Sequence, residues 1–333
     1  MFFLFISNTD IARVPGLSVA GANAEVLPYT SPADADVIRF GRPVSIDCFP
    51  MDPEGHPTPA IITRAAVETA DIPICVVRAG SNMTPAPPYV ELCSSPGKDP
   101  RVTASVTDVN KIFDDAVSLA KNFTKDIDKV MLAESIPGGT TTAFLVLRAL
   151  GYDCMVSSSS NVNPIEMKEK IWRDASARLG IKKGDFKNDA LKAISELGDP
   201  MQAAVLGFIL GSEKRTKIVL AGGTQMLAVS ACLRAMGCER EITVATTKYI
   251  INDKTSSFSE LSKLLETNTY AAPLDFKNSP YKGLRDYENG FVKEGVGAGG
   301  AVLYASWHGV GVDEVITKTN GLYREITKPE EFK

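Results

Sequence analysis

The chain uses the same local pattern twice: a short apolar run, a Gly-Gly-Thr turn and then a segment with apolar residues at helical spacing. The first copy covers residues 130–150, with Val130-Met-Leu-Ala before the turn, and the second covers residues 216–228. Apolar runs of this length are typical of buried parallel strands, and the spacing after the turn predicts a helix. Two strand–turn–helix units predict an α/β fold in three layers around a mainly parallel sheet.

The turn of the first copy is suited to holding a phosphate. It consists of Pro137, Gly138, Gly139, Thr140 and Thr141. Glycines allow the backbone to approach a ligand closely, and threonines at a helix start leave hydroxyl and N–H groups facing an anion. Glu134 adds a carboxylate at the end of the strand, the edge where open α/β sheets bind ligands. The alternative is a tight strand–helix turn with a good cap, but the carboxylate favours a site.

The turn of the second copy, Gly222-Gly223-Thr224, is a further candidate for the same role. Neither turn matches G-x-G-x-x-G or G-x-x-x-x-G-K-[ST], so dinucleotide-binding and Walker-type sites are excluded. These residues alone do not decide which of the two turns would hold a phosphate.

A second acid, Glu294, lies within residues 289–304, where five glycines are concentrated. Close approach of the backbone to a ligand or to another helix would explain so many glycines. The alternative for Glu294 is a glutamate at a helix N-terminus, favoured there by the helix dipole.

Composition excludes several classes of protein. With 333 residues and 44% hydrophobic content, the chain can bury a large core, and its net charge of −4 gives no electrostatic case for nucleic acid. No apolar run has the length that a membrane span needs, and residues 1–7 resemble a first strand more than a signal peptide. Six scattered cysteines and two histidines form no zinc pattern, so we expect free thiols, a cytoplasmic location and no metal.

Other segments carry weaker signals. Residues 37–40 and 44–47 look like strands, and the proline-rich residues 80–101 look like a binding loop or a flap. Asn163 is suited to cap a helix that begins at Pro164. That helix carries Lys168 and Lys170 in its early turns, where lysines are usually solvated.

Three stretches together resemble the nicotinate-nucleotide–dimethylbenzimidazole phosphoribosyltransferases of cobamide synthesis, most of all their archaeal branch. Glu134-Ser-Ile-Pro-Gly-Gly-Thr-Thr stands where that family has Glu-x-Gly-Ile-Gly-Asn-Thr-Thr, and Glu294-Gly-Val-Gly-Ala resembles its Glu-Gly-Thr-Gly-Ala. The segment from His56 to Arg64 is similar to the family's base-site loop and helix. The likeness extends from about residue 50 to 310. The chain departs from the family at the missing Asn and at His56 and Arg64, which leaves the accepted base open.

The resemblance implies one Rossmann-like domain that forms a homodimer. A large lobe would cover about residues 50–275, and a small lobe would combine about residues 1–49 and 276–333. The implied reaction moves a phosphoribosyl group from nicotinate mononucleotide to dimethylbenzimidazole or an adenine-like base, with small molecules as partners and no cofactor or metal.

The resemblance also implies roles for individual residues. Glu294 would be the general base, and Glu134 would stabilise positive charge on the ribose. A lysine of the family matches Lys170, with Lys168 as the alternative match, and it would lie near the donor's phosphate or carboxylate. The remaining residues expected to bind substrate are His56, Arg64, Gly295 and Gly297, together with the two Gly-Gly-Thr turns.

Two alternatives remain from the residues alone. A phosphoribosyltransferase with a pyrophosphorylated donor usually has two adjacent acids after the strand, and here Ser135 follows Glu134. A non-catalytic nucleotide-binding protein could use the same fold, because a fold does not determine a function.

Overall fold

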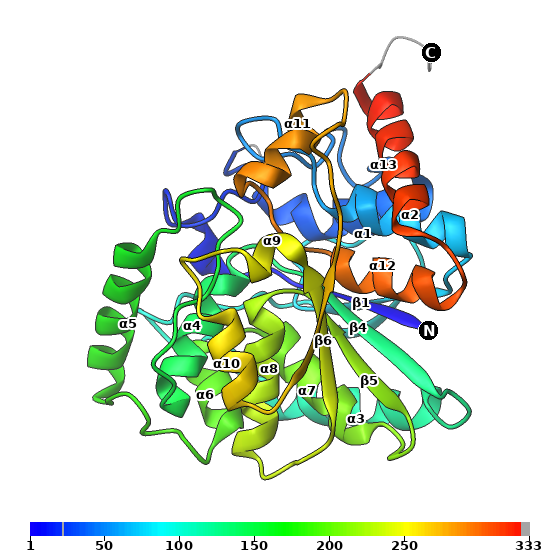
Figure 1. The fold of residues 1–333 in the computed structure, drawn as a ribbon. Helices are drawn as coiled ribbons and strands as arrows, with labels where there is room; N and C mark the ends of the chain where they lie inside the picture. The colour runs from blue at the N-terminus through cyan, green and yellow to red at the C-terminus, as the bar shows by residue number, and fades with distance from the viewer. Residues whose placement is uncertain (22, 328–333) are drawn as a thin grey trace.

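The computed structural model describes residues 1–21 and 23–327, which form an α/β fold around a parallel sheet (Figure 1). Seven strands of the described chain pair in the order β3-β2-β1-β4-β5-β6-β7, all in parallel. They are β1 (Phe2–Ile6), β2 (Ile74–Ala79), β3 (Tyr89–Cys93), β4 (Lys129–Ser135), β5 (Lys217–Ala221), β6 (Ile242–Thr247) and β7 (Asn268–Ala272). The fold class expected from the two strand–turn–helix units is confirmed.

The first strand occupies the centre of the sheet, between β2 and β4. All five residues of β1 are buried, and Phe5 and Ile6 pair with Glu134 and Ser135 of β4. The chain runs from β1 outward to β2 and β3 and then returns to β4 on the other side, so the strand order reverses between β1 and β4. Such a switch point opens a crevice at the carboxyl ends of the strands. Residues 2–6 therefore belong to the main sheet, although we expected them in the smaller lobe.

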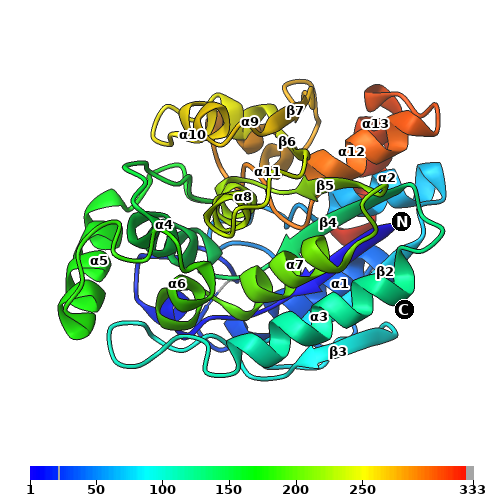
Figure 2. The same ribbon diagram turned by 90° about the horizontal axis from the view of Figure 1, so that it is seen from below.

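Helices cover both faces of the sheet (Figure 2). One face carries α3 (Val109–Phe123), α4 (Gly139–Leu150), α5 (Ile165–Leu179), α6 (Ala190–Leu197), α7 (Pro200–Gly211), α8 (Thr224–Ala235) and α10 (Phe258–Leu264). The other carries α1 (Thr30–Phe40), α2 (Ala60–Ala70), α11 (Lys282–Arg285), α12 (Ala298–Trp307) and α13 (Val312–Thr327). Short elements complete the chain: α9 (Lys248–Ile251), η1 (Asp10–Arg13), η2 (Leu27–Tyr29) and η3 (Asp286–Asn289).

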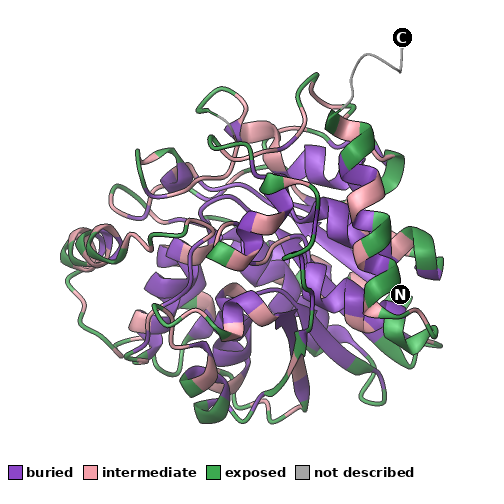
Figure 3. Ribbon diagram, turned by 45° about the horizontal axis from the view of Figure 1, so that its top comes forward, coloured by how far each residue is buried: buried purple, intermediate pink, exposed green. Residues whose placement is uncertain are grey.

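The alternation of side chains along β1 builds both cores. Phe3 and Phe5 pack into the core under α3 to α8, whereas Phe2, Leu4 and Ile6 pack into the core under α1, α2 and α12. Successive side chains of a strand point to opposite faces, so a strand that is apolar throughout must be covered on both sides. Figure 3 shows the result: the strands and the inner faces of the helices are buried, while α5 and α13 expose much of their surface.

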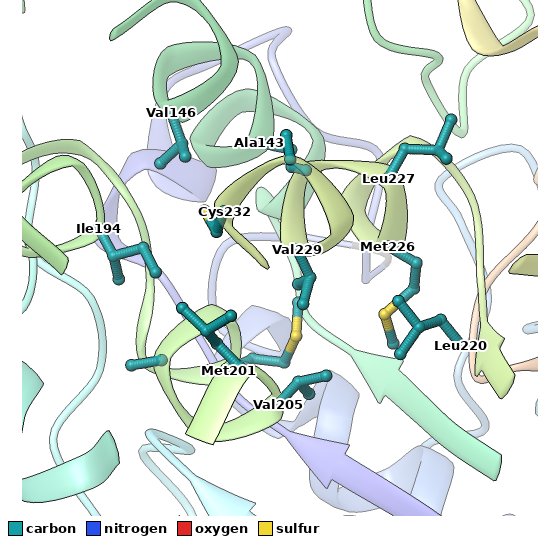
Figure 4. Packing of buried hydrophobic residues seen from close by; sticks show 14 of the residues in the cluster. Ala143, Val146, Ile194, Met201, Val205, Leu220, Met226, Leu227, Val229 and Cys232 are labelled. Carbon is teal, nitrogen blue, oxygen red and sulfur yellow. The ribbon is translucent and has the colours of Figure 1, made fainter. Parts of the chain in front are cut away.

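Helices α4, α6, α7 and α8 meet in the larger core (Figure 4). Val146 of α4, Ile194 of α6 and Met201 of α7 are fully buried there, as is Val229 of α8. Helix α4 begins at Gly139, the second glycine of the first Gly-Gly pair, so its packing in this core anchors the turn at the end of β4.

Three local predictions were wrong. Residues 37–40 lie in helix α1, because Ala33 and Val37 repeat at helical spacing that a four-residue window hides, and residues 44–47 form no strand. Helix α5 begins at Ile165 and has no side-chain cap, since the side chain of Asn163 bonds to a lysine instead. The proline-rich residues 80–101 include the edge strand β3.

No helix within the described ranges combines the length and the apolar character that crossing a membrane requires.

Two glycine-to-alanine substitutions test the packing of helix on helix. A Cβ atom at Gly207 of α7 would lie 2.3 Å from the carbonyl oxygen of Phe113 in α3, whereas one at Gly321 of α13 would meet nothing within 4 Å. Gly207→Ala should therefore lower the free energy of unfolding by about 1–3 kcal/mol through overpacking. Gly321→Ala should raise it by roughly 0.5–1 kcal/mol, because alanine favours helix. Urea unfolding of the two variants and the wild type measures both effects, and a neutral Gly207→Ala would contradict the close α3–α7 contact.

Candidate functional site

A cleft opens at the carboxyl end of β4, next to the switch point. Its walls come mainly from residues 17–21, 50–52, 56–59, 134–140, 157–159 and 292–296, and Thr30, Asp34, Gln225 and Ile250 complete them. Glu134, Glu294 and His56 all line this cleft, as do Pro137, Gly138, Gly139, Thr140 and Gly295. Two acids that lie far apart in the sequence thus face one space.

Glu134 is the more deeply buried of the two glutamates, with only 2% of its surface exposed. No side chain among the described residues donates a hydrogen bond to its carboxylate. Burial raises the pKa of Glu134 well above its usual value, and the negative charges of Glu294, Asp199 and Asp34 raise it further. Among the described residues, the backbone N–H of Ile136 is the group that opposes this shift. The group is therefore poised to ionise when a cation enters the cleft.

Glu294 is held by backbone groups at the start of α12. Its carboxylate accepts hydrogen bonds from the N–H groups of Gly295 (3.1 Å) and Gly299 (3.3 Å). Burial outweighs these bonds and raises the pKa of Glu294 to about 7. The alternative drawn from the sequence, a glutamate favoured by a helix N-terminus, thus agrees with the geometry as well, since Gly299 lies in the first turn of α12.

The backbone around Glu294 is strained. Val292, Lys293 and Val296 have φ values of 59°, 44° and 56°, in the left-handed region that residues other than glycine rarely occupy. Each such residue costs on the order of 1–3 kcal/mol and persists only where its surroundings enforce it. Here the N–H of Val292 donates to the carbonyl of Ser159 at 2.7 Å, and the hydroxyl of Thr247 donates to the carbonyl of Lys293. Strain of this kind concentrates at functional sites.

Two buried lysines hold the serine-rich loop at residues 157–160. Lys168 donates to the carbonyl of Ser157 and to the side chain of Asn163, both at 2.9 Å. Lys293 donates to the carbonyls of Ser158 and Ser160, both at 2.7 Å. Burial, with the nearby charge of Lys293, lowers the pKa of Lys168 to about 7. Both ammonium groups therefore fix the shape of the loop and are not themselves open to a ligand.

Lys170, the lysine preferred from the sequence, lies away from the cleft. Its side chain is 65% exposed and pairs with Asp174 at 2.7 Å on the outer face of α5. Lys168, the alternative match for the family's lysine, is the residue that lies next to the cleft wall. Helical geometry explains the correction, because residues two positions apart on a helix face in nearly opposite directions.

Three other expected residues do not line the cleft. Arg64 donates to the carbonyl of Ile38 and pairs with Glu68, so it fastens α2 to α1. Thr141 is fully buried behind the turn. A Cβ atom at Gly297 would lie 2.5 Å from that of Ala133, so this glycine serves helix–sheet packing.

The second Gly-Gly-Thr turn also lies behind the cleft wall. A Cβ atom at Gly222 would come within 3.3 Å of a carboxylate oxygen of Glu134, and the hydroxyl of Thr224 accepts the N–H of Ser157 at 3.2 Å. Gly222, Gly223 and Thr224 thus support residues of the cleft and do not face it, in contrast to the first turn.

His56 is locked between two carboxylates. Its Nδ1 lies 2.6 Å from Asp52 and its Nε2 lies 3.0 Å from Asp286, and its ring packs against that of Phe291 in a tilted arrangement, with 4.2 Å between the ring centroids. Hydrogen bonds from Lys282 and His56 hold the pKa of Asp286 below its usual value. Because both ring nitrogens are engaged, His56 joins the loop at 50–59 to the loop at 286–291 and presents no nitrogen to a ligand.

Asp34 is a cleft residue that sequence reasoning missed. It lies in α1, and its two carboxylate oxygens accept hydrogen bonds from the hydroxyls of Thr58 and Ser135, both at 2.7 Å. Burial raises the pKa of Asp34 to about 7. Its neighbours in the sequence form no motif, so only the folding of α1 against β4 reveals it.

Comparison with known proteins identifies the chain's relatives. It matches no family model. The UPF0284 protein TK0853 of Thermococcus kodakarensis is 46% identical over 330 residues, covering 98% of this chain and 97% of that protein. The UPF0284 protein of Methanosarcina acetivorans is 43% identical over 318 residues, covering 94% and 91%. The chain belongs to the UPF0284 family.

Solved structures with the same fold come from Thermus thermophilus. The nicotinate-nucleotide–dimethylbenzimidazole phosphoribosyltransferase of that organism superposes with a TM-score of 0.61 at 13% identity, covering 97% of this UPF0284 chain and 82% of the enzyme. A structure described as CobT gives a TM-score of 0.59 at 14% identity, covering 97% and 83%. At this level of identity the likeness establishes a shared fold for the UPF0284 chain, and the fold alone.

The two lysines of α5 are expected to differ in their effect on stability. Lys168→Met removes the donor for the carbonyl of Ser157 and the side chain of Asn163 and leaves buried acceptors unpaired, which should cost about 1–3 kcal/mol. Lys170→Met removes an exposed ion pair and should stay within about 0.5 kcal/mol of the wild type. Thermal unfolding of both variants at pH 6 compares them, and equal losses would contradict the assignment of Lys168 as the buried partner.

Replacement of Glu294 by glutamine is expected to alter how stability depends on pH. The carboxyl group has an ordinary pKa of 4.5 in the unfolded chain and a pKa of about 7 in the folded protein. Between these values the folded state keeps a proton that the unfolded state has lost, so the free energy of unfolding falls as the pH rises. Glutamine cannot ionise, so Glu294→Gln should lose less stability between pH 5 and pH 8, by about 1–3 kcal/mol. Urea unfolding at both pH values measures the difference, and parallel losses in the two proteins would contradict the raised pKa.

Proposed function

We propose that this protein transfers the phosphoribosyl group of nicotinate mononucleotide to a nitrogen of an aromatic base, releasing nicotinate and forming an α-ribotide for cobamide synthesis. The observation that carries the proposal is the meeting of Glu134 and Glu294 in one cleft beside the first Gly-Gly-Thr turn. The shared fold with a phosphoribosyltransferase of that specificity supports the choice of reaction.

The charge of the cleft suits the donor. In nicotinate mononucleotide the ribose C1′ is bonded to a cationic pyridinium nitrogen, and when that bond breaks its electron pair neutralises the ring while positive charge develops on the sugar. Glu134 is buried and has no side-chain donor among the described residues, so a neighbouring cation would lower its pKa and ionise it. The resulting carboxylate would stabilise the charge that develops on the ribose.

Glu294 suits the acceptor. The attacking ring nitrogen forms the new bond to C1′, and a proton must leave a ring N–H of the base. A general base works best when its pKa lies near the working pH, and the pKa of Glu294 is about 7. We assign this proton to Glu294, whose position is fixed by the N–H groups of Gly295 and Gly299.

The donor phosphate is assigned to the first turn. Gly138 has a φ of 81° and directly precedes α4, a helix of 12 residues, and Gly138, Gly139 and Thr140 line the cleft, so the start of this helix is available to an anion. Ser158 and Ser159 line the same cleft, on a loop whose carbonyls Lys168 and Lys293 hold by hydrogen bonds.

A turnover assay tests the proposal. Purified protein is incubated with nicotinate mononucleotide and either dimethylbenzimidazole or adenine, in buffer with a chelator of magnesium, and released nicotinate is measured. Glu294→Gln should lower the rate by about 10²–10⁴-fold, the usual contribution of a general base. Calorimetry should show that the same variant binds nicotinate mononucleotide within a few-fold of the wild type.

The matched control is Glu166→Gln, which removes an exposed acid in the first turn of α5 and should leave the rate unchanged. If nicotinate mononucleotide binds but no nicotinate is released with either base, a non-catalytic nucleotide-binding protein would be favoured. A strict requirement for magnesium and a pyrophosphorylated donor would favour the other phosphoribosyltransferase chemistry. Absence of nicotinate mononucleotide binding would refute the proposal.

A further inference from the structure

The cleft has many hydrogen-bond acceptors and few available donors on the side of α1 and α12. Asp34, Glu134 and Glu294 all line it. The two basic side chains in its described lining are engaged, His56 with Asp52 and Asp286, and Lys293 with the carbonyls of Ser158 and Ser160. A ligand that brings its own N–H groups therefore suits this side.

Glu134 gives independent evidence that a ligand completes this side. Only 2% of its surface is exposed and it lines the cleft, yet no side chain in the described part of the chain donates to it. A buried carboxylate without such a partner is costly, and a donor or cation on the ligand would remove that cost.

Asp34 has unused capacity as an acceptor. Each of its oxygens accepts one hydroxyl, from Thr58 or from Ser135, and a carboxylate offers about four acceptor positions. Those two hydroxyls fix the carboxylate in place without neutralising it. Asp34 and Glu294 line the same cleft.

The wall around Asp34 is apolar and suited to a flat ring. Pro50, Met51, Pro57 and Pro59 line this part of the cleft, and Pro59 lies 3.4 Å from where a Cβ atom of Gly295 would stand. Rigid apolar walls with a few fixed polar groups are typical of sites for small aromatic ligands. The polar groups here are carboxylates on two different elements, α1 and the loop before α12.

We propose that Asp34 selects the acceptor by accepting a hydrogen bond from an exocyclic amino group, so that the preferred substrate is an amino-substituted heteroaromatic base. Glu294 then receives the ring proton, and Asp34 binds the amino group beside it. This inference rests on the proposed function for the identity of the second substrate. The hydrogen bond to Asp34 would favour adenine-like acceptors over benzimidazoles that carry no amino group.

A binding experiment with two matched probes tests the inference without turnover. Adenine and purine differ by the amino group alone, and each is titrated calorimetrically into the full chain, with and without saturating ribose 5-phosphate. The wild type should bind adenine at least about tenfold more tightly than purine, as expected for a hydrogen bond to a charged acceptor. In Asp34→Asn the amide presents a donor in place of an acceptor, so the preference should disappear.

The control variant is Asp36→Asn, in the same helix. Asp36 is also buried, but it accepts the N–H groups of Val44, Ser45 and Ala86 and does not line the cleft, so the ratio of the two affinities should be that of the wild type. Circular dichroism checks that each variant is folded. If Asp34→Asn does not fold, the test compares the ratio of the adenine and purine affinities in the wild type with the same ratio in Asp34→Glu.

Equal affinities of the wild type for the two probes would overturn the inference, and so would a preference that survives in Asp34→Asn. Failure of both probes to bind, in a protein that does bind nicotinate mononucleotide, would overturn the role of Asp34 and leave the donor half of the proposed function intact. If nicotinate mononucleotide does not bind but the adenine preference depends on Asp34, the proposed function fails and the amino-group site stands.

Discussion

The structure depends on three carboxyl groups withdrawn from water in one cleft, two of them buried and that of Glu294 half-buried. Asp34, Glu134 and Glu294 come from α1, β4 and the loop before α12, and burial raises the pKa of each. Ionising all three without a ligand would be costly, because like charges repel strongly where water is scarce. The cluster therefore resists carrying three negative charges at once, and an incoming cation would favour the ionised form of its members. This dependence of ionisation on a bound cation supports the proposed donor, whose ribose is bonded to a cationic pyridinium.

The sheet provides the positions that this cluster requires. β1 and β4 lie side by side where the strand order reverses, so groups that follow them open into a single crevice. Helix α1 covers one face of these strands and brings Asp34 to Ser135, while α12 covers the same face and fixes Glu294 through the N–H of Gly299. The second Gly-Gly-Thr turn packs behind Glu134. The repeated pattern in the sequence thus yields one turn that lines the cleft and one that supports it.

Much of the fold could be predicted from the sequence, because apolar runs and glycine turns are local signals. The strand before Glu134, the helix after Gly139 and the apolar first strand are all read from a few consecutive residues. Residues 37–40 were misassigned for the opposite reason, since the helical spacing of α1 is visible only over a longer window. The side chains of the site were harder to predict, because which face of a helix they occupy depends on tertiary packing. Lys168 and Lys170 are indistinguishable in the sequence, yet one is fully buried beside the cleft and the other faces solvent. Asp34 has no motif around it and reaches the cleft only because α1 packs against β4.

The strained loop at residues 292–296 also determines how the cleft can open. The N–H of Val292 and the ammonium of Lys293 both bond to carbonyls of the loop at 157–160, and Lys168 bonds to the carbonyl of Ser157 in the same loop. If these bonds break, the three left-handed residues lose what enforces them, and the backbone gains by relaxing. The two loops should therefore open together as one cooperative unit, with their amides exchanging hydrogen at a common rate. A ligand that binds either loop would then slow exchange in both, although they lie far apart in the chain.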